Sequence, residues 1–186
     1  MRALRFLSGN PHKIREVEDI LSGIDIEIVA VDYKISEIQT IDVPKLVHGK
    51  CIRAFQRVSQ PIFVEHTSLK ISALNGFPGG LTQVFWDTLQ ADNVSKLFGS
   101  LPDPTVVAST RIAFCDGKRI HQFEGEVEGS IAAEPRGNRD FQWDCVFVPK
   151  GETETFAELG DRKNEISMRR RALESFAEFL KVKIDG

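Results

Sequence analysis

The chain has 186 residues, of which 41% are hydrophobic and 27% are charged, and its formal net charge is −3. This length and composition suit a globular chain with a real core rather than a disordered one, and we expect a single domain over residues 1–186, divided into two lobes. The small negative charge argues against binding to DNA or RNA duplexes, because such binding depends on neutralising phosphates. A small anionic ligand in a local basic pocket is still compatible with it.

Cysteine content and hydropathy bear on the cellular compartment and on membrane contact. Cys51, Cys115 and Cys145 are odd in number and widely spaced, which favours reduced core or interface residues over a disulfide framework or a zinc site. No apolar stretch approaches the ~20 residues of a membrane span, and Met1 leads directly into a strand pattern rather than a signal peptide. We therefore expect a cytoplasmic protein without membrane contact.

The first two predicted elements are a strand over Ala3 to Leu7 and a helix from Pro11. Asn10 can cap this helix, and a proline suits its first position. The turn that begins at Ser8 would then leave backbone N–H groups free for an anion, with Lys13 adding a cation in the first helical turn. Such turns are common in α/β proteins, so an ordinary strand–helix connection is the alternative.

Later segments extend this pattern and then change it. Strands are predicted over Ile26 to Val31, Ile62 to Val64 with Ser68 to Leu74, Val106 to Cys115, and Arg119 to Val127; helices are predicted over about Val43 to Val58, Asp92 to Phe98, and from Ser167 onward. The Asp116-Gly117 pair marks a hairpin. Early alternation followed by a hairpin predicts an α/β fold with a mixed sheet covered by helices.

Two glutamates and a histidine are candidates for metal and proton chemistry. Glu37 and Glu65 could bind Mg²⁺, which prefers carboxylates and substrate phosphates. His66 could be a base, a ligand, or a hydrogen-bonded polar residue at a strand end. Most single glutamates are merely solvated, so Glu37 and Glu65 could be either metal ligands or solvated side chains.

Aromatic and cationic residues concentrate between positions 141 and 171. Phe141 and Trp143 stand two positions apart and could form two walls for a flat ring, or could belong to the core. Lys163 and the run Arg169 to Arg171 supply cations, and the arginines fall where the last helix should begin. Because a helix N-terminus already carries partial positive charge, the cluster favours an anionic partner such as phosphate, with a solvated face as the alternative.

Four segments stand out in order along the chain: LSGNPHKIREVEDIL, VEHTSLKISALNGFPG, FQWDCVFVPKGETETFAEL and KNEISMRRRAL. Together they resemble the successive signatures of the inosine triphosphate pyrophosphatase family, which removes deaminated purine nucleotides. The resemblance implies a two-lobed α/β fold with a long mixed sheet and a central nucleotide cleft, usually as a homodimer. It also implies Mg²⁺-dependent hydrolysis of ITP, dITP or XTP to the monophosphate and pyrophosphate.

The resemblance further implies the roles of particular residues. Ser8, Asn10 and Lys13 would belong to the triphosphate-binding turn, Lys50 would bind phosphate, Glu37 and Glu65 would hold the metal, Phe141 and Trp143 would enclose the purine beside Asp144, and Lys163 and Arg169 would lie near the 6-oxo group. An ammonium or guanidinium group can donate to a 6-keto oxygen but pairs poorly with a 6-amino group. Inosine would therefore be accepted and adenine rejected.

Four positions depart from the family pattern. His66 stands where the family has the second acid of its Glu-Asp or Asp-Asp pair, and a neutral imidazole cannot replace a hard oxygen ligand of Mg²⁺. Met168 replaces a histidine, Gln142 a glycine and Cys145 a proline. Because the phosphate-binding and stacking residues survive, this pattern favours retained binding with weakened catalysis.

Three functions follow from these observations. We expect a nucleotide-sensing subunit that binds dITP or ITP and reports to an effector protein in a stress or antiviral defence system. The alternative is an active pyrophosphatase in which His66 is the base while Glu37 and Glu65 hold Mg²⁺, since imidazole has a suitable ordinary pKa of about 6.5. A scaffold without a nucleotide is the third, and the apolar segment from Phe77 to Trp86 could be an interface in any of them or part of the core.

Overall fold

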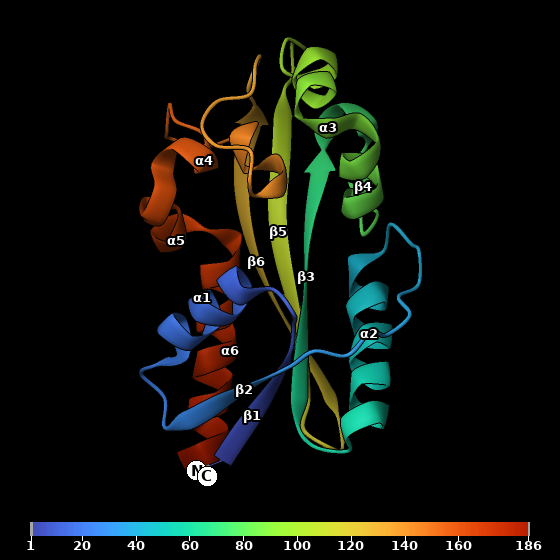
Figure 1. Cartoon of the computed structure of the whole chain (residues 1–186), viewed down its shortest axis with the longest axis vertical. Helices are drawn as coiled ribbons and strands as arrows, with labels where there is room; N and C mark the ends of the chain where they lie inside the picture. The colour runs from blue at the N-terminus through green and yellow to red at the C-terminus, as the bar shows by residue number, and fades with distance from the viewer. Residues whose placement is uncertain (1, 186) are drawn as a thin grey trace.

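The computed structural model describes residues 2–185. A seven-stranded sheet runs through the molecule (Figure 1), in the order β2-β1-β3-β5-β6-β7 with β4 paired to β3. The strands are β1 (Arg2–Leu7), β2 (Ile26–Val31), β3 (Ile62–Ile71), β4 (Pro78–Gly79), β5 (Thr105–Cys115), β6 (Ile120–Ile131) and β7 (Phe147–Pro149).

Helices account for most of the remaining regular structure. The α-helices are α1 (Pro11–Leu21), α2 (Val43–Val58), α3 (Thr82–Phe98), α4 (Phe156–Leu159), α5 (Lys163–Ile166) and α6 (Met168–Asp185). Short 3₁₀ helices are η1 (Ser72–Leu74), η2 (Gln142–Cys145) and η3 (Gly160–Arg162). Within residues 2–185, none of these helices is both long and apolar enough to cross a membrane.

The sheet is mixed, as the sequence predicts. β1 lies parallel to β2 and to β3, and α1 and α2 connect these strands. β3, β5, β6 and β7 pair antiparallel, and Ile62 lies opposite Cys115 at one end of the long β3–β5 ladder. The hairpin predicted at Asp116-Gly117 is confirmed, with Gly117 at a φ of 97°.

Helices cover both faces of the long strands (Figure 1). α1 and α6 lie on one face, where Phe63 stacks on Phe6 and also contacts Phe176 of α6. α2 covers the opposite face through buried residues such as Val47 and Cys51. α3 and α4 lie at the end of the sheet far from both termini, around a third core that includes η2.

The middle of the chain differs from the prediction. Residues predicted as two strand pieces form one continuous β3, and α3 is longer than the helix predicted over Asp92 to Phe98. Phe85 and Trp86 of its first half face the core, whereas Val84 is exposed and blurs the apolar pattern. Gln90 adopts a φ of 59° and kinks the helix. The apolar residues before and after the kink therefore do not follow one continuous helical period. The apolar segment from Phe77 to Trp86 is therefore partly buried in the core, which was the alternative to an interface.

The last helix begins where predicted. The backbone N–H of Arg170 donates to the Ser167 hydroxyl at 3.2 Å, which confirms Ser167 as the cap. The first turn of α6 lies directly against β6 at Gly125, where an added Cβ would overlap the Met168 carbonyl oxygen and the Ala172 nitrogen. Only a residue without a side chain lets this end of α6 reach the sheet.

We expect Gly125→Ala to lower the free energy of unfolding by about 1–3 kcal/mol, because α6 must move off the sheet to accept the methyl group. Gly23→Ala is the matched control, since nothing lies within 4 Å of the added Cβ. Urea unfolding of both variants measures the difference. Equal stability of the two variants would contradict the close approach at Gly125.

Candidate functional site

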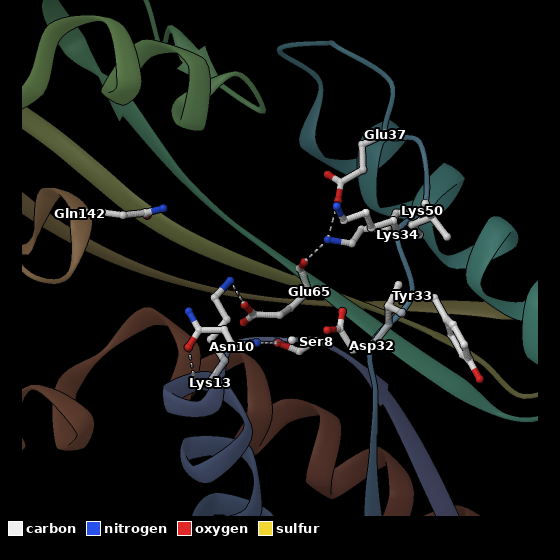
Figure 2. A pocket seen from close by; sticks show the side chains of 13 residues that line it. Ser8, Asn10, Lys13, Asp32, Tyr33, Lys34, Glu37, Lys50, Glu65 and Gln142 are labelled. Carbon is white, nitrogen blue, oxygen red and sulfur yellow. Dashed lines mark hydrogen bonds and ion pairs between the residues drawn. The ribbon is translucent and has the colours of Figure 1, made fainter.

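Three cavities lie around the N-terminal end of α1 and the middle of β3. The turn cavity, of ≈ 470 Å³, is lined by Leu7, Ser8, Gly9, Asn10, Lys13, Asp32, Tyr33, Lys34, Ile35, Glu37, Lys50, Glu65 and Gln142 (Figure 2). The His66 cavity, of ≈ 230 Å³, is lined by Lys13, Glu37, Lys50, Glu65, His66, Thr67, Thr82, Gln83 and Gln142. Because these two cavities share five residues, they adjoin each other.

The third hollow, the Phe141 cavity, lies on the other side of the N-terminal end of α1. It has a volume of ≈ 580 Å³, and its walls include His12, Glu16, Phe141, Asp144 and Lys163. α1 therefore contributes to two hollows, through Asn10 and Lys13 on one side and through His12 and Glu16 on the other.

The turn before α1 has the predicted cap but fewer free donors than predicted. The Asn10 side chain accepts hydrogen bonds from the N–H groups of His12 and Lys13, at 2.9 and 3.3 Å. The Asn10 N–H donates to the Ser8 hydroxyl, and the Ser8 N–H donates to the Val31 carbonyl. These backbone donors are thus already in use, so positive charge in the turn cavity comes mainly from lysine side chains.

Two of the three lysines that line the turn cavity pair with carboxylates (Figure 2). The Lys13 ammonium lies 2.5 Å from Glu65 Oε1, and the Lys50 ammonium lies 2.8 Å from Glu37 Oε1. Lys50 also donates to the Glu65 backbone carbonyl at 3.3 Å. An anionic ligand could take over either lysine and leave its carboxylate available to a cation.

Glu65 is held ionised by a second, buried cation. Arg169 is 1% exposed, donates to Glu65 Oε2 at 2.8 Å and pairs with Glu16 of α1. Burial opposes ionisation of Glu65, but Arg169 and Lys13 outweigh it and hold the pKa of this carboxyl well below its usual range. Arg169 does not itself line these three cavities, but its partner Glu16 lines the Phe141 cavity, so its place near a purine base stays a prediction.

The other arginines at the start of α6 also have partners within the protein. Arg170 donates to the Asn164 carbonyl, and Arg171 donates to the Glu126 carbonyl. Carboxylates and backbone carbonyls of the chain itself therefore already accept hydrogen bonds from these arginines, and a phosphate at this helix start stays a prediction.

His66 lies in the middle of β3 and not at a strand end. Its Nε2 atom is buried and has no hydrogen-bond partner among the described residues. Burial, helped by the charge of Lys50, lowers the pKa of His66 to about 4, so the imidazole is neutral at pH 7. A neutral ring in the His66 cavity can accept a proton or a hydrogen bond.

The carboxylates of this region suit a magnesium ion that arrives with a ligand. Residues 2–185 contain no group of three or more His, Cys, Asp or Glu side chains placed to hold a metal. Glu37 and Glu65 nevertheless line the same cavity beside two lysines. Mg²⁺ usually binds one or two carboxylates together with substrate phosphates, and this donor set fits that mode.

The Phe141 cavity places a ring face beside a donor and free acceptors. The Lys163 ammonium lies 4.3 Å from the Phe141 ring centroid and 2.5 Å from Asp144 Oδ2. Asp144 Oδ1 and Glu16 Oε1 are buried and have no partner within the described part of the chain. Burial, the main cause, raises the pKa of Asp144. Such acceptors are available to the donor groups of a ligand.

Trp143 does not form the second wall of this cavity. It is 2% exposed and packs its ring against Phe147 and Phe156 in the core. The prediction assumed strand-like alternation, but Trp143 lies in η2, where residues two apart do not share a face. The alternative core interpretation holds for Trp143, and of these two residues only Phe141 lines the cavity, where Phe156 supplies another ring.

Sequence reasoning missed several residues of the site. Asp32 follows β2 directly, and an added Cβ at Gly9 would lie 2.8 Å from its carboxylate, so the glycine admits the acid to the turn cavity. Glu16 and Gln83 also went unnoticed because nothing in their local pattern marks them. The position of Asp32 at the carboxyl end of a parallel strand was the one signal present.

The fold and these cavities define an α/β protein with a charged cleft beside the first strand–helix turn. Residues 4–179 match the Ham1 family. The chain is 37% identical over 183 residues to the dITP/XTP pyrophosphatase of Methanopyrus kandleri, covering 97% of each chain. It is 36% identical over 184 residues to the inosine triphosphate pyrophosphatase of Yarrowia lipolytica, covering 97% of this chain and 96% of the relative.

Solved structures agree with the sequence relatives. A HAM1 protein from Coxiella burnetii superimposes with a TM-score of 0.84 at 24% identity, covering 97% of this chain and 99% of that one. A nucleoside-triphosphatase, or dITP/XTP pyrophosphatase, from Mycobacterium abscessus gives a TM-score of 0.74 at 25% identity, covering 95% and 97%. The chain belongs to the Ham1 family of inosine triphosphate pyrophosphatases.

Because Phe141 lines a cavity and Trp143 lies in the core, replacing each by alanine should affect different properties. Trp143→Ala should lower the free energy of unfolding by about 3–5 kcal/mol, because it empties a core site. Phe141→Ala should leave stability nearly unchanged and weaken inosine nucleotide binding by about 1–3 kcal/mol, the usual value of a base-stacking contact. Thermal unfolding and calorimetry of both variants test this. A large loss of stability in Phe141→Ala would contradict the assignment.

Proposed function

We propose that this chain binds deaminated purine nucleoside triphosphates such as dITP, ITP and XTP and hydrolyses them, with Mg²⁺, to the monophosphate and pyrophosphate. The observation that carries this proposal is the pair of hollows on either side of the N-terminal end of α1. One offers a ring face with a donor and free acceptors, and the other offers three lysines with three carboxylates. The activities of the relatives support the same substrate class.

Base selection would follow from the groups of the Phe141 cavity. Hypoxanthine carries an N1–H donor and a 6-oxo acceptor. The free oxygens of Asp144 and Glu16 can accept from the N1–H, and the Lys163 ammonium can donate to the oxo group. Adenine reverses both positions, with an unprotonated N1 and a 6-amino donor. Bound adenine would leave the buried acceptors of Asp144 and Glu16 without a donor. Unpaired buried polar groups discriminate strongly against the wrong ligand.

The triphosphate would occupy the turn cavity. Lys13 and Lys50 would exchange their carboxylate partners for phosphate oxygens, and Glu37 and Glu65 would then hold Mg²⁺. The metal would supply charge neutralisation at the phosphate oxygens. His66 is neutral and lies in the adjoining cavity, where it can accept the proton of an attacking water.

A second candidate is a nucleotide receptor whose hydrolysis is weak. His66 favours it, because a base with a pKa of about 4 abstracts protons poorly at neutral pH and an imidazole is a poor ligand for Mg²⁺. Such a receptor would bind dITP in the same cleft and pass the signal to an effector protein, either as a monomer or as a homodimer. The receptor and the enzyme differ only in turnover.

Pyrophosphate release from dITP with Mg²⁺ separates these two candidates. If the chain is an enzyme that uses His66, the wild type releases pyrophosphate, and His66→Asn slows release by about 10²-fold or more. Its rate should be flat near neutral pH and fall as the pH approaches about 4, where the imidazole becomes protonated. His48→Asn, on the exposed face of α2, is the control.

The receptor candidate predicts the opposite set of results. The wild type would bind dITP without releasing pyrophosphate, and His66→Asp would gain activity several-fold or more by restoring an acid at this position. A wild type that neither binds nor hydrolyses dITP would refute both candidates.

A further inference from the structure

Gln142 is held in an unfavourable backbone conformation at the edge of the cleft. Its φ is 41°, in the left-handed region that favours glycine, although glutamine has a full side chain. Residues kept in such conformations concentrate at active sites and ligand contacts. The side chain is exposed rather than packed in the core, so core packing does not account for its retention.

The position of Gln142 connects the two parts of the cleft. Its side chain lines both the turn cavity and the His66 cavity, and in Figure 2 it extends into the open space between the labelled side chains of the site. The preceding residue, Phe141, lines the Phe141 cavity instead. The backbone between these two residues therefore runs along the boundary between the hollows.

A chain of hydrogen bonds fixes which atom of the Gln142 amide is left without a partner. Asp87 can only accept, so its bond of 2.8 Å to Gln83 must come from the Gln83 amide nitrogen. The Gln83 oxygen then faces Gln142 and accepts from its amide nitrogen at 2.6 Å. The side-chain carbonyl oxygen of Gln142 accepts no hydrogen bond from the other described residues and is therefore available as an acceptor for a ligand.

We propose that Gln142 accepts a hydrogen bond from a hydroxyl group of the nucleotide sugar. The inference rests on the proposed function, with the base in the Phe141 cavity and the phosphates in the turn cavity, because the sugar then lies at the boundary where Gln142 stands. A carbonyl oxygen repels phosphate oxygens and is complemented by a hydroxyl donor. Gln142 is thus a specificity-determining residue for the sugar.

The test compares binding of three ligands: the α,β-methylene analogues of ITP, dITP and 2′,3′-dideoxy-ITP, which cannot release pyrophosphate. We expect the wild type to bind at least one hydroxylated analogue about five-fold more tightly than the dideoxy analogue, the usual size of one hydrogen bond. Gln142→Gly should reduce this preference to less than about two-fold. Glycine suits the backbone here, so the variant should fold.

Gln90→Gly is the matched control, because Gln90 also has a positive φ, of 59°, and lies in α3 outside the three cavities. It should keep the wild-type sugar preference. Comparing ITP with dITP shows whether the 2′- or the 3′-hydroxyl is the donor, and either assignment supports the proposal.

An unchanged sugar preference in Gln142→Gly, or no preference in the wild type, would overturn the role of Gln142 alone. A wild type that binds none of the three analogues would overturn the proposed function as well. The two failures are therefore distinguishable in one set of calorimetric titrations.

Discussion

The buried ion pair between Arg169 and Glu65 is the interaction on which the rest of the cleft depends. Arg169 lies in the first turn of α6, Glu65 lies in the middle of β3, and the second partner, Glu16, comes from α1. Three elements distant in sequence are thereby fixed around one charge. A buried guanidinium is costly without such partners, so the arrangement specifies how these elements pack as much as it stabilises them.

This pair also determines the electrostatics of the two hollows. Because Arg169 is satisfied internally, it keeps Glu65 ionised without occupying the cleft, and Glu65 in turn attracts Lys13. Glu16 Oε2 accepts a hydrogen bond from Arg169, whereas Glu16 Oε1 has no partner among the described residues. Glu16 also lines the Phe141 cavity. The same buried network thus contributes to the cation-binding side and to the ring-binding side of the cleft.

Local patterns predicted much of the fold but only part of the site. The cap at Asn10, the helix α2 and the hairpin at Asp116-Gly117 follow from short-range chemistry, and the structure confirms them. Trp143 was misplaced because its burial depends on contacts across the fold, such as those with Phe147 and Phe156, which no spacing rule contains. The burial of Arg169 likewise depends on its bond to Glu65. Sequence can identify reactive residue types, whereas tertiary contacts decide which of them face a ligand.

Calorimetric titration of the wild type with dITP and with dATP tests the central claim most directly, since both ligands carry the same sugar and triphosphate. We predict that dITP binds at least about 100-fold more tightly, because adenine would leave the buried oxygens of Asp144 and Glu16 without donors. Equal affinity for the two nucleotides would contradict the assignment of the Phe141 cavity to the base.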